Sequence, residues 1–262
     1  MISEKLVDDF TVIKNRWLND RHFVLDLQSP QKLPSILPGQ FVEVLVENSA
    51  TTLLRRPFSI YSTDIKNNII RLLIQVKGEG TKKIGQLRET EKVNLIYPLG
   101  NPFSLPDHER VLLVGGGVGA APLMFLSQHL NSLGMFPGLL LGARSKNDLF
   151  DLDLFKKQCK DVYITTEDGS EGEKGLVTNH SVFGKSPFPY EKIYCCGPDP
   201  MMHAVARLGK SLGIDCEVSL ENYMACGFGV CLCCITPSVH GNLRSCVEGP
   251  VFNTKLLKWE EK

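Results

Sequence analysis

The sequence lacks an excess of charge of either sign. Its 262 residues contain 29 Lys and Arg against 29 Asp and Glu, so the formal net charge is zero. Proteins that bind nucleic acids need a positive field to meet phosphates, so this balance argues against that class. A neutral chain also gains little solubility from its charge, which suggests that a partner covers part of its surface.

Long apolar segments are also missing. No run approaches the roughly 20 residues of a membrane-spanning helix. The first ten residues, MISEKLVDDF, have neither the basic start nor the apolar stretch of a signal peptide. We therefore expect a cytoplasmic protein. With 43% hydrophobic and 22% charged residues, the composition is that of an ordinary globular chain.

Two long stretches differ in their hydrophobic pattern. Residues 1–103 contain short β-branched segments separated by Gly, Pro and Asn turns, which predicts an antiparallel barrel or sandwich. Residues 104–215 alternate apolar strands with helices, which predicts a parallel sheet whose ligands bind at the carboxyl ends of its strands. The predicted strands are 41–47, 69–76, 92–97, 111–114, 139–141, 162–164 and 193–196, and the predicted helices are 122–133 and 199–212.

The final stretch, residues 216–262, is rich in cysteine. Cys226, Cys231 and Cys234 follow the spacing C-x4-C-x2-C, and Cys246 lies further on. Because cytosolic thiols stay reduced, such density indicates metal or redox chemistry, and this spacing is typical of a plant-type [2Fe–2S] loop. A structural zinc site and buried thiols without metal are the alternatives. The choice of Cys234 over Cys233 as third ligand rests on spacing alone.

A glycine-rich segment, Gly115–Pro122, lies between a predicted strand and a predicted helix. Gly117 and Gly119 would let a pyrophosphate approach backbone N–H groups at the start of that helix. A tight packing turn would also use glycines. The acidic residue usual about 20 positions later in dinucleotide folds is missing, because Leu141–Arg144 occupies that region. A variant nucleotide-binding α/β fold is therefore favoured over a simple Rossmann fold.

The third motif, Arg55–Ser62, lies in the strand-rich stretch. The Arg56 guanidinium could clamp a phosphate, while Phe58 and Ser59 could contact a ring system. A charged turn followed by a strand is the alternative interpretation.

Together these motifs resemble the ferredoxin–NADP reductase superfamily over essentially the whole chain. In that superfamily R-x-[FY]-[ST] binds the flavin, which matches Arg56–Ser59, and C-G-P-x-x-M lines the nicotinamide site, which matches Cys196–Met201. The cysteine loop, M-A-C-G-x-G-x-C-x-x-C followed by C-x-x-G-P-V-F, matches 224–234 and 246–252. This loop resembles the electron-transfer subunits of NAD-dependent (class 1B) dihydroorotate dehydrogenases.

The resemblance implies a multidomain β and α/β chain. Its parts would be an antiparallel Greek-key FAD-binding barrel over 1–103, a parallel-sheet NAD-binding domain over 104–215 and a small [2Fe–2S] domain over 216–262. The residues implied to contact FAD are Arg56, Pro57, Phe58, Ser59, Leu73, Ile74, Gln75, Gly80 and Thr81. Those implied at the NAD site are Gly117, Gly119, Cys196 and Gly197, and the implied cluster ligands are Cys226, Cys231, Cys234 and Cys246.

The resemblance also implies a partner, an FMN-containing catalytic subunit that oxidises dihydroorotate to orotate for pyrimidine biosynthesis, in a two-plus-two heterotetramer. Within this chain, a nicotinamide accepts a hydride, a cluster carries one electron at a time, and a flavin can exchange electrons with both. The acidic pair Glu167 and Asp168 favours NAD over NADP, although a solvated turn would suit the same residues. Tyr223, directly before the cysteine loop, is expected to pack in the core or on a cofactor.

Two alternatives remain open. The chain could instead serve a hydrogenase or transhydrogenase complex, or act as a free-standing NAD(P)H–ferredoxin reductase, because these share the fold and the cofactors. A different class is a non-catalytic, zinc-stapled nucleotide-binding module, which would be colourless.

Overall fold

The structure is a computed structural model that describes residues 5–47 and 51–259, and the chain divides into two compact units. The first unit contains the described residues up to Pro102, together with Glu221–Thr236 and Asn242–Pro250. The second contains Phe103–Leu220, Pro237–Gly241 and those from Val251 onward. Most of the cysteine segment therefore belongs to the same unit as the N-terminal strands. The predicted division into three domains, after residues 103 and 215, stays a prediction.

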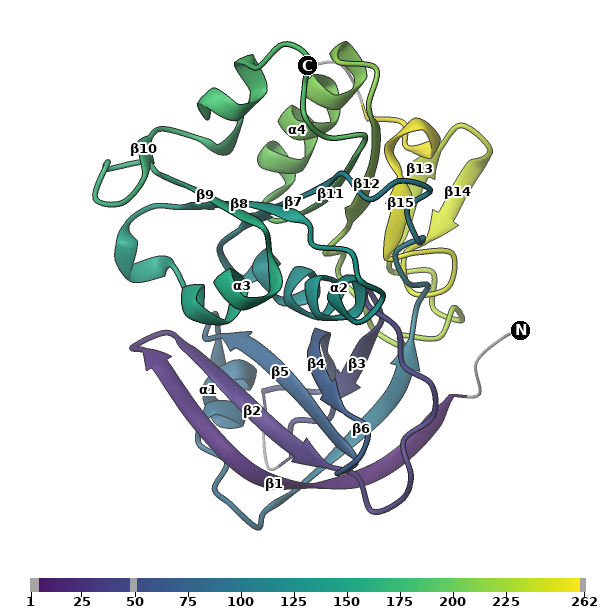
Figure 1. The fold of residues 1–262 in the computed structure, drawn as a ribbon. Coiled ribbons are helices and arrows are strands. Elements are labelled where there is room, and N and C mark those ends of the chain that lie inside the picture. The colour runs from purple at the N-terminus through teal and green to yellow at the C-terminus, as the bar shows by residue number, and fades with distance from the viewer. Residues whose placement is uncertain (1–4, 48–50, 260–262) are drawn as a thin grey trace. The chain divides into compact units, whose positions relative to one another are not determined.

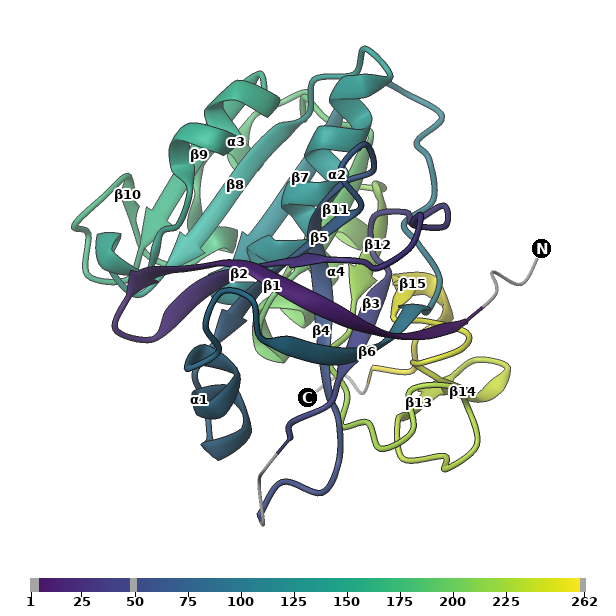
Figure 2. The same cartoon turned by 90° about the horizontal axis from the view of Figure 1, so that it is seen from below.

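Six antiparallel strands of the first unit form a closed barrel in the order β1-β2-β5-β4-β3-β6 (Figures 1 and 2). Strand β1 pairs with both β2 and β6, which closes the barrel, and the non-sequential order confirms the Greek-key prediction. Apolar side chains such as Phe10, Leu25 and Leu72 fill its interior. The strands are β1 (Leu6–Asn19), β2 (His22–Gln28), β3 (Phe41–Val44), β4 (Arg56–Asp64), β5 (Ile69–Gln75) and β6 (Lys92–Leu99), with helix α1 (Glu79–Gly85) between β5 and β6.

The second unit is built on a seven-stranded sheet in the order β10-β9-β8-β7-β11-β12-β15. All its strands are parallel except β15, which pairs antiparallel with β12. Helices α2 and α3 cover one face and α4 covers the other (Figure 1). The strands are β7 (Val111–Gly116), β8 (Gly138–Ala143), β9 (Asp161–Thr166), β10 (Glu173–Lys174), β11 (Lys192–Cys196), β12 (Asp215–Ser219) and β15 (Val251–Asn253).

The remaining elements are short apart from two helices of the second unit. The α-helices are α2 (Ala120–Ser132), α3 (Leu152–Gln158) and α4 (Asp199–Ser211). The 3₁₀ turns are η1 (Gly117–Gly119), η2 (Lys146–Asp148), η3 (Val177–Asn179), η4 (Ser181–Gly184) and η5 (Thr254–Leu256). Strands β13 (Ile235–Ser238) and β14 (Gly241–Arg244) pair with each other. Among the described residues, no helix has the length and apolar character needed to cross a membrane.

The strand order of the sheet reverses between β7 and β11. Strands β8 and β9 follow β7 on one side, whereas β11 and β12 lie on the other. In open parallel sheets, ligands bind outside the carboxyl ends of the strands at such a reversal. Here the reversal places Gly115, at the end of β7, beside Cys196, at the end of β11.

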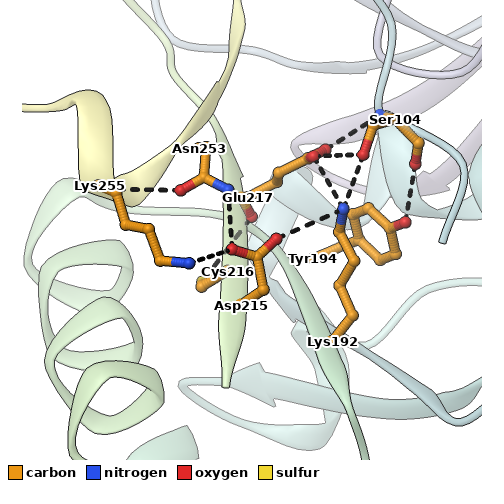
Figure 3. Close-up of polar contacts among 8 residues, drawn as sticks. All are labelled: Ser104, Lys192, Tyr194, Asp215, Cys216, Glu217, Asn253 and Lys255. Carbon is orange, nitrogen blue, oxygen red and sulfur yellow. Dashed lines mark hydrogen bonds and ion pairs between the residues drawn. The ribbon is translucent and has the colours of Figure 1, made fainter. Parts of the chain in front are cut away.

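Toward the amino ends of β11 and β12, a polar network joins these strands to residues near the beginning and the end of the second unit (Figure 3). Lys192 Nζ donates to Ser104 Oγ at 2.7 Å and to Glu217 Oε1 at 3.0 Å. The Ser104 N–H donates to Glu217 Oε2 at 3.0 Å. Asn253 Nδ2 in β15 donates to Asp215 Oδ1 at 2.9 Å. These bonds satisfy charged groups that the sheet partly buries, so the network serves the fold.

Candidate cofactor sites

The flavin motif Arg56–Ser59 forms the first part of β4. All four side chains are half-buried, so this part of the strand is only partly covered. A Cβ added to Gly80, in the first turn of α1, would lie 3.2 Å from Arg56 Nε. The fold therefore brings together a basic side chain and a glycine that the sequence separates by more than 20 residues, as a phosphate cradle requires.

The other implied flavin residues lie in β5 and in α1. The side chains of Leu73 and Ile74 in β5 are buried, while Gln75 is half-buried. Thr81 Oγ1 accepts the Gly78 N–H at 3.1 Å and donates to the Gly78 carbonyl at 2.9 Å. The Thr81 hydroxyl thus fixes the turn that enters α1.

The two halves of the implied nucleotide site meet at the carboxyl ends of β7 and β11. A Cβ on Gly119 would lie 2.5 Å from the Cys196 carbonyl oxygen, and one on Gly197 would lie 3.1 Å from Gly116 N. Neither Gly119 nor Gly197 leaves room for a side chain, so the backbones of the two loops pack directly against each other. By contrast, Gly117 has a φ of +53° and open space where its Cβ would stand.

Cys196 and the acidic pair Glu167 and Asp168 also lie in this unit. The Cys196 thiol is buried, 3.5 Å from the Ser219 carbonyl oxygen. The Asp168 carboxylate accepts the Ser170 N–H at 2.9 Å and the Ser170 hydroxyl at 2.6 Å, which lowers the Asp168 pKa. Asp168 therefore stabilises its own turn, while Glu167 beside it is exposed.

The cysteine loop packs against the barrel within the first unit. Cys234 and Cys246 are buried in one cluster with Phe41 of β3 and Leu99 of β6. Cys233, whose role the spacing leaves open, is exposed. The two adjacent cysteines lie in a turn directly before β13, and only Cys234 enters the buried cluster.

The surroundings of Cys226 suit a thiolate. The N–H groups of Val230 and Cys231 donate to Cys226 Sγ at 3.4 and 3.5 Å. Burial opposes ionisation, but the backbone N–H groups of Cys231 and its neighbours outweigh it and lower the Cys226 pKa to about 6. Burial, followed by contact with the Cys234 thiol, raises the pKa of Cys246 to about 12.

This donor set fits an iron–sulfur cluster, in which N–H groups surround ligating thiolates. Glycine conformations shape the loop, since Gly227 and Gly229 have φ values of +75° and +92°. In the described part of the chain, no three His, Cys, Asp or Glu side chains converge in the way that a single metal ion needs. The C-x4-C-x2-C spacing with a distant fourth cysteine is typical of a two-iron cluster, whereas structural zinc sites usually use pairs of C-x2-C, so these cysteines suit the cluster better.

Sequence reasoning missed Glu43, the polar residue of β3. Its side chain is 0% exposed, and neither carboxylate oxygen has a hydrogen-bond partner among the described residues. A lone glutamate in an apolar strand was the available signal. The expectation that Tyr223 packs in the core is wrong, because its side chain is 91% exposed, whereas its packing on a cofactor stays a prediction.

An antiparallel barrel, a parallel nucleotide-type sheet and a four-cysteine loop define the class of flavin- and iron–sulfur-dependent, NAD-linked oxidoreductases. Family models match each part: the oxidoreductase FAD-binding domain at residues 10–103, the oxidoreductase NAD-binding domain at 113–207, and the iron–sulfur cluster binding domain of dihydroorotate dehydrogenase B at 221–258. The chain belongs to the family of dihydroorotate dehydrogenase B electron-transfer subunits.

Similar proteins span nearly the whole chain. The dihydroorotate dehydrogenase B (NAD(+)) electron-transfer subunit of Desulforamulus reducens is 36% identical, covering 91% of this chain and 93% of its own. The subunit of the same name from Fusobacterium nucleatum is 33% identical, with coverage of 94% and 96%. A chain in the structure of an NADH-dependent reduced ferredoxin-NADP oxidoreductase is 29% identical and aligns with a TM-score of 0.86, covering 96% of this chain and 90% of that one.

Proposed function

We propose that this chain accepts electrons from an FMN-containing subunit that oxidises dihydroorotate, and delivers them to NAD⁺. The cysteine loop carries the proposal, because it supplies a one-electron site in a chain that also has a nicotinamide domain. FAD, when bound, would exchange two electrons with the nicotinamide and single electrons with the cluster. The partners would assemble in the cytoplasm as a two-plus-two heterotetramer.

In the barrel, Arg56 would bind the FAD phosphates together with the backbone at Gly80. Pro57, Phe58 and Ser59 would hold the flavin ring, with the Ser59 hydroxyl as a hydrogen-bond partner. The backbone of Leu73, Ile74 and Gln75 would line the same site, and Thr81 would hold the α1 turn in shape for the pyrophosphate. The contact between Gly80 and Arg56 supports this assignment.

In the second unit, Gly117 and Gly119 would receive the NAD pyrophosphate, and Cys196 and Gly197 would lie near the nicotinamide. The open space at Gly117 supports a close approach of ligand to backbone. Exposed Glu167 would repel a 2′-phosphate, which favours NAD over NADP. Equal rates of flavin reduction by NADPH and NADH would contradict this preference.

Cys226, Cys231, Cys234 and Cys246 would ligate the cluster. The burial of Cys234 beside Cys246 supports Cys234 rather than Cys233 as the third ligand. Exposed apolar side chains lie in the loop and directly before it, namely Tyr223, Val230 and Leu232, and such surface is typical of protein interfaces. We propose that the catalytic subunit docks there, because electrons must cross at the cluster.

The direct test is Cys231→Ser in the assembled complex. We expect loss of dihydroorotate-linked NAD⁺ reduction with retention of FAD, because the residues proposed to bind FAD lie in β4, β5 and α1 and the Cys231 side chain is exposed. Flavin and iron content are measured on the same samples. Full activity in a variant that lacks iron would contradict the proposal.

Purification with bound partners separates this function from its relatives. Co-purification of an FMN-bearing partner that oxidises dihydroorotate would support the proposal. Co-purification of hydrogenase subunits would contradict it and indicate a role in a hydrogenase complex. A colourless protein containing zinc would indicate a non-catalytic module.

A further inference from the structure

The buried glutamate of β3, Glu43, is a charged residue that none of the proposed roles uses. A carboxyl group taken out of water without a partner is costly, so such groups in native proteins call for an explanation. Both Glu43 carboxylate oxygens are inaccessible and unpartnered among residues 5–47 and 51–259. Burial raises the pKa of Glu43 to about 7, although nearby Arg55 opposes the shift.

Glu43 occupies the strand that lies between the two proposed redox elements of the first unit. In the barrel, β3 pairs with β4 on one side, where Glu43 stands opposite Pro57 of the flavin motif. On the other side Glu43 stands opposite Ile96 of β6, which packs against the cluster containing Cys234 and Cys246. Glu43 therefore has the flavin motif on one neighbouring strand and, on the other, a residue that packs against the cysteine cluster.

The Glu43 side chain is in contact with the cysteine loop itself. A Cβ added to Gly227 would lie 2.6 Å from Glu43 Cγ and 3.0 Å from Glu43 Oε1. Gly227 directly follows the proposed ligand Cys226 and has a φ of +75°. Only glycine leaves room for the carboxyl group at this point, so the loop and Glu43 fit each other.

The available positive charge does not neutralise this carboxylate by direct contact. Arg55 Nη1 donates to the Glu43 backbone carbonyl at 3.3 Å, and Arg55 Nη2 donates to Asn94 Oδ1 at 2.5 Å. The guanidinium is therefore committed to other acceptors. An anion in such surroundings acts strongly on nearby charge, because little water screens it.

We propose that Glu43 is a positioning residue for electron transfer, whose buried carboxylate beside Gly227 lowers the reduction potential of the iron–sulfur cluster. This inference rests on the proposed function, because it requires a cluster in the cysteine loop. Net charge near a cluster is one of the factors that set its potential. A lower potential would favour onward transfer of each electron from the cluster toward the flavin.

The test compares Glu43→Gln with wild-type holoprotein in a redox titration of the cluster followed by electron paramagnetic resonance. The titration is run at pH 9, because alkaline solution favours the ionised form of a carboxyl group. We expect the variant cluster to be easier to reduce by at least tenfold in equilibrium constant, or about 59 mV for one electron. Glu47→Gln is the matched control, because exposed Glu47 carries the same charge in water, and no shift is expected.

Iron and acid-labile sulfide are measured first, which separates this inference from the proposed function. Wild-type protein without a cluster would overturn both. An intact cluster with the same potential in wild type and Glu43→Gln would overturn only the role of Glu43. Glu43→Ala, which also removes the charge and needs less space, is expected to shift the potential in the same direction. Loss of the cluster in both neutral variants, with normal assembly in the charged Glu43→Asp, would show that the carboxylate is needed to assemble the cluster and would overturn its role in setting the potential.

Discussion

At the scale of single residues, two adjacent cysteines should behave differently. Cys234 is buried beside Cys246, whereas the Cys233 side chain is exposed. We expect Cys234→Ser to lose iron and acid-labile sulfide, because a ligand is removed, while Cys233→Ser keeps both. Metal analysis and the visible spectrum of anaerobically purified protein check this. A cluster retained in Cys234→Ser but lost in Cys233→Ser would reverse the assignment.

Two glycines of the second unit offer a second contrast. A Cβ on Gly119 would meet the backbone of Cys196 at 2.5 Å, and backbone cannot move aside as a flexible side chain can. Gly119→Ala should therefore lower the free energy of unfolding by about 1–3 kcal/mol. A Cβ added to Gly184 would have nothing within 4 Å, so Gly184→Ala should change the free energy of unfolding by less than about 0.5 kcal/mol. Urea denaturation measures both, and equal midpoints would contradict the packing argument.

At the scale of elements, the polar network in Figure 3 should stabilise the second unit through its buried members. The side chains of Lys192 and Glu217 are 13% and 8% exposed. Lys192→Met leaves the Glu217 carboxylate without its cation, which should lower the free energy of unfolding by about 3–5 kcal/mol. Lys255 is 75% exposed in its pair with Asp215, so Lys255→Met should cost no more than about 1 kcal/mol. Similar losses in urea denaturation would contradict a role for burial.

The same network predicts part of the acid sensitivity. Burial opposes ionisation of Asp215, but hydrogen bonds from Asn253 and Lys255 outweigh it and lower the Asp215 pKa. A lowered pKa stabilises the fold fully above the ordinary aspartate value of about 3.9, and this stability is lost as pH falls through the lower folded value. Urea midpoints of Asp215→Asn should therefore fall less steeply than wild type below about pH 4. If the urea midpoints of the variant and of wild type fell in parallel with pH, Asp215 would not contribute to the acid sensitivity.

Elements with strong local patterns were predictable from sequence. The expected helix at 122–133 corresponds to α2 (Ala120–Ser132), and the strand expected at 69–76 corresponds to β5 (Ile69–Gln75). Strand β1 (Leu6–Asn19) went unpredicted, because its exposed polar residues hide the alternation and its pairing with β6 joins distant parts of the chain. Among site residues, the spacing of Cys226, Cys231 and Cys234 was informative, since ligands of one group must be close. The contact of Glu43 with Gly227 depends on tertiary packing, which no local pattern encodes.

At the scale of the whole molecule, the neutral charge and the exposed apolar side chains of the cysteine loop have a common explanation in the proposed partner. Tyr223, at 91% exposure, is a large aromatic residue of the kind that anchors interfaces. Tyr223→Asp should weaken association with the catalytic subunit at least tenfold, or about 1.4 kcal/mol, because a charge would be buried there. Titration calorimetry with the partner measures this.

The matched control for that docking surface is Leu176→Asp, which places the same charge on an exposed leucine of the second unit, 59% accessible and outside the cysteine loop. It should leave the affinity unchanged. Iron content and NADH-driven reduction of a dye should be normal in both variants, since neither residue is proposed to hold a cofactor. Unchanged affinity in Tyr223→Asp, or equal weakening in both variants, would place the partner elsewhere. Because electrons must leave the partner close to the cluster, such a result would also require an entry route other than the cysteine loop.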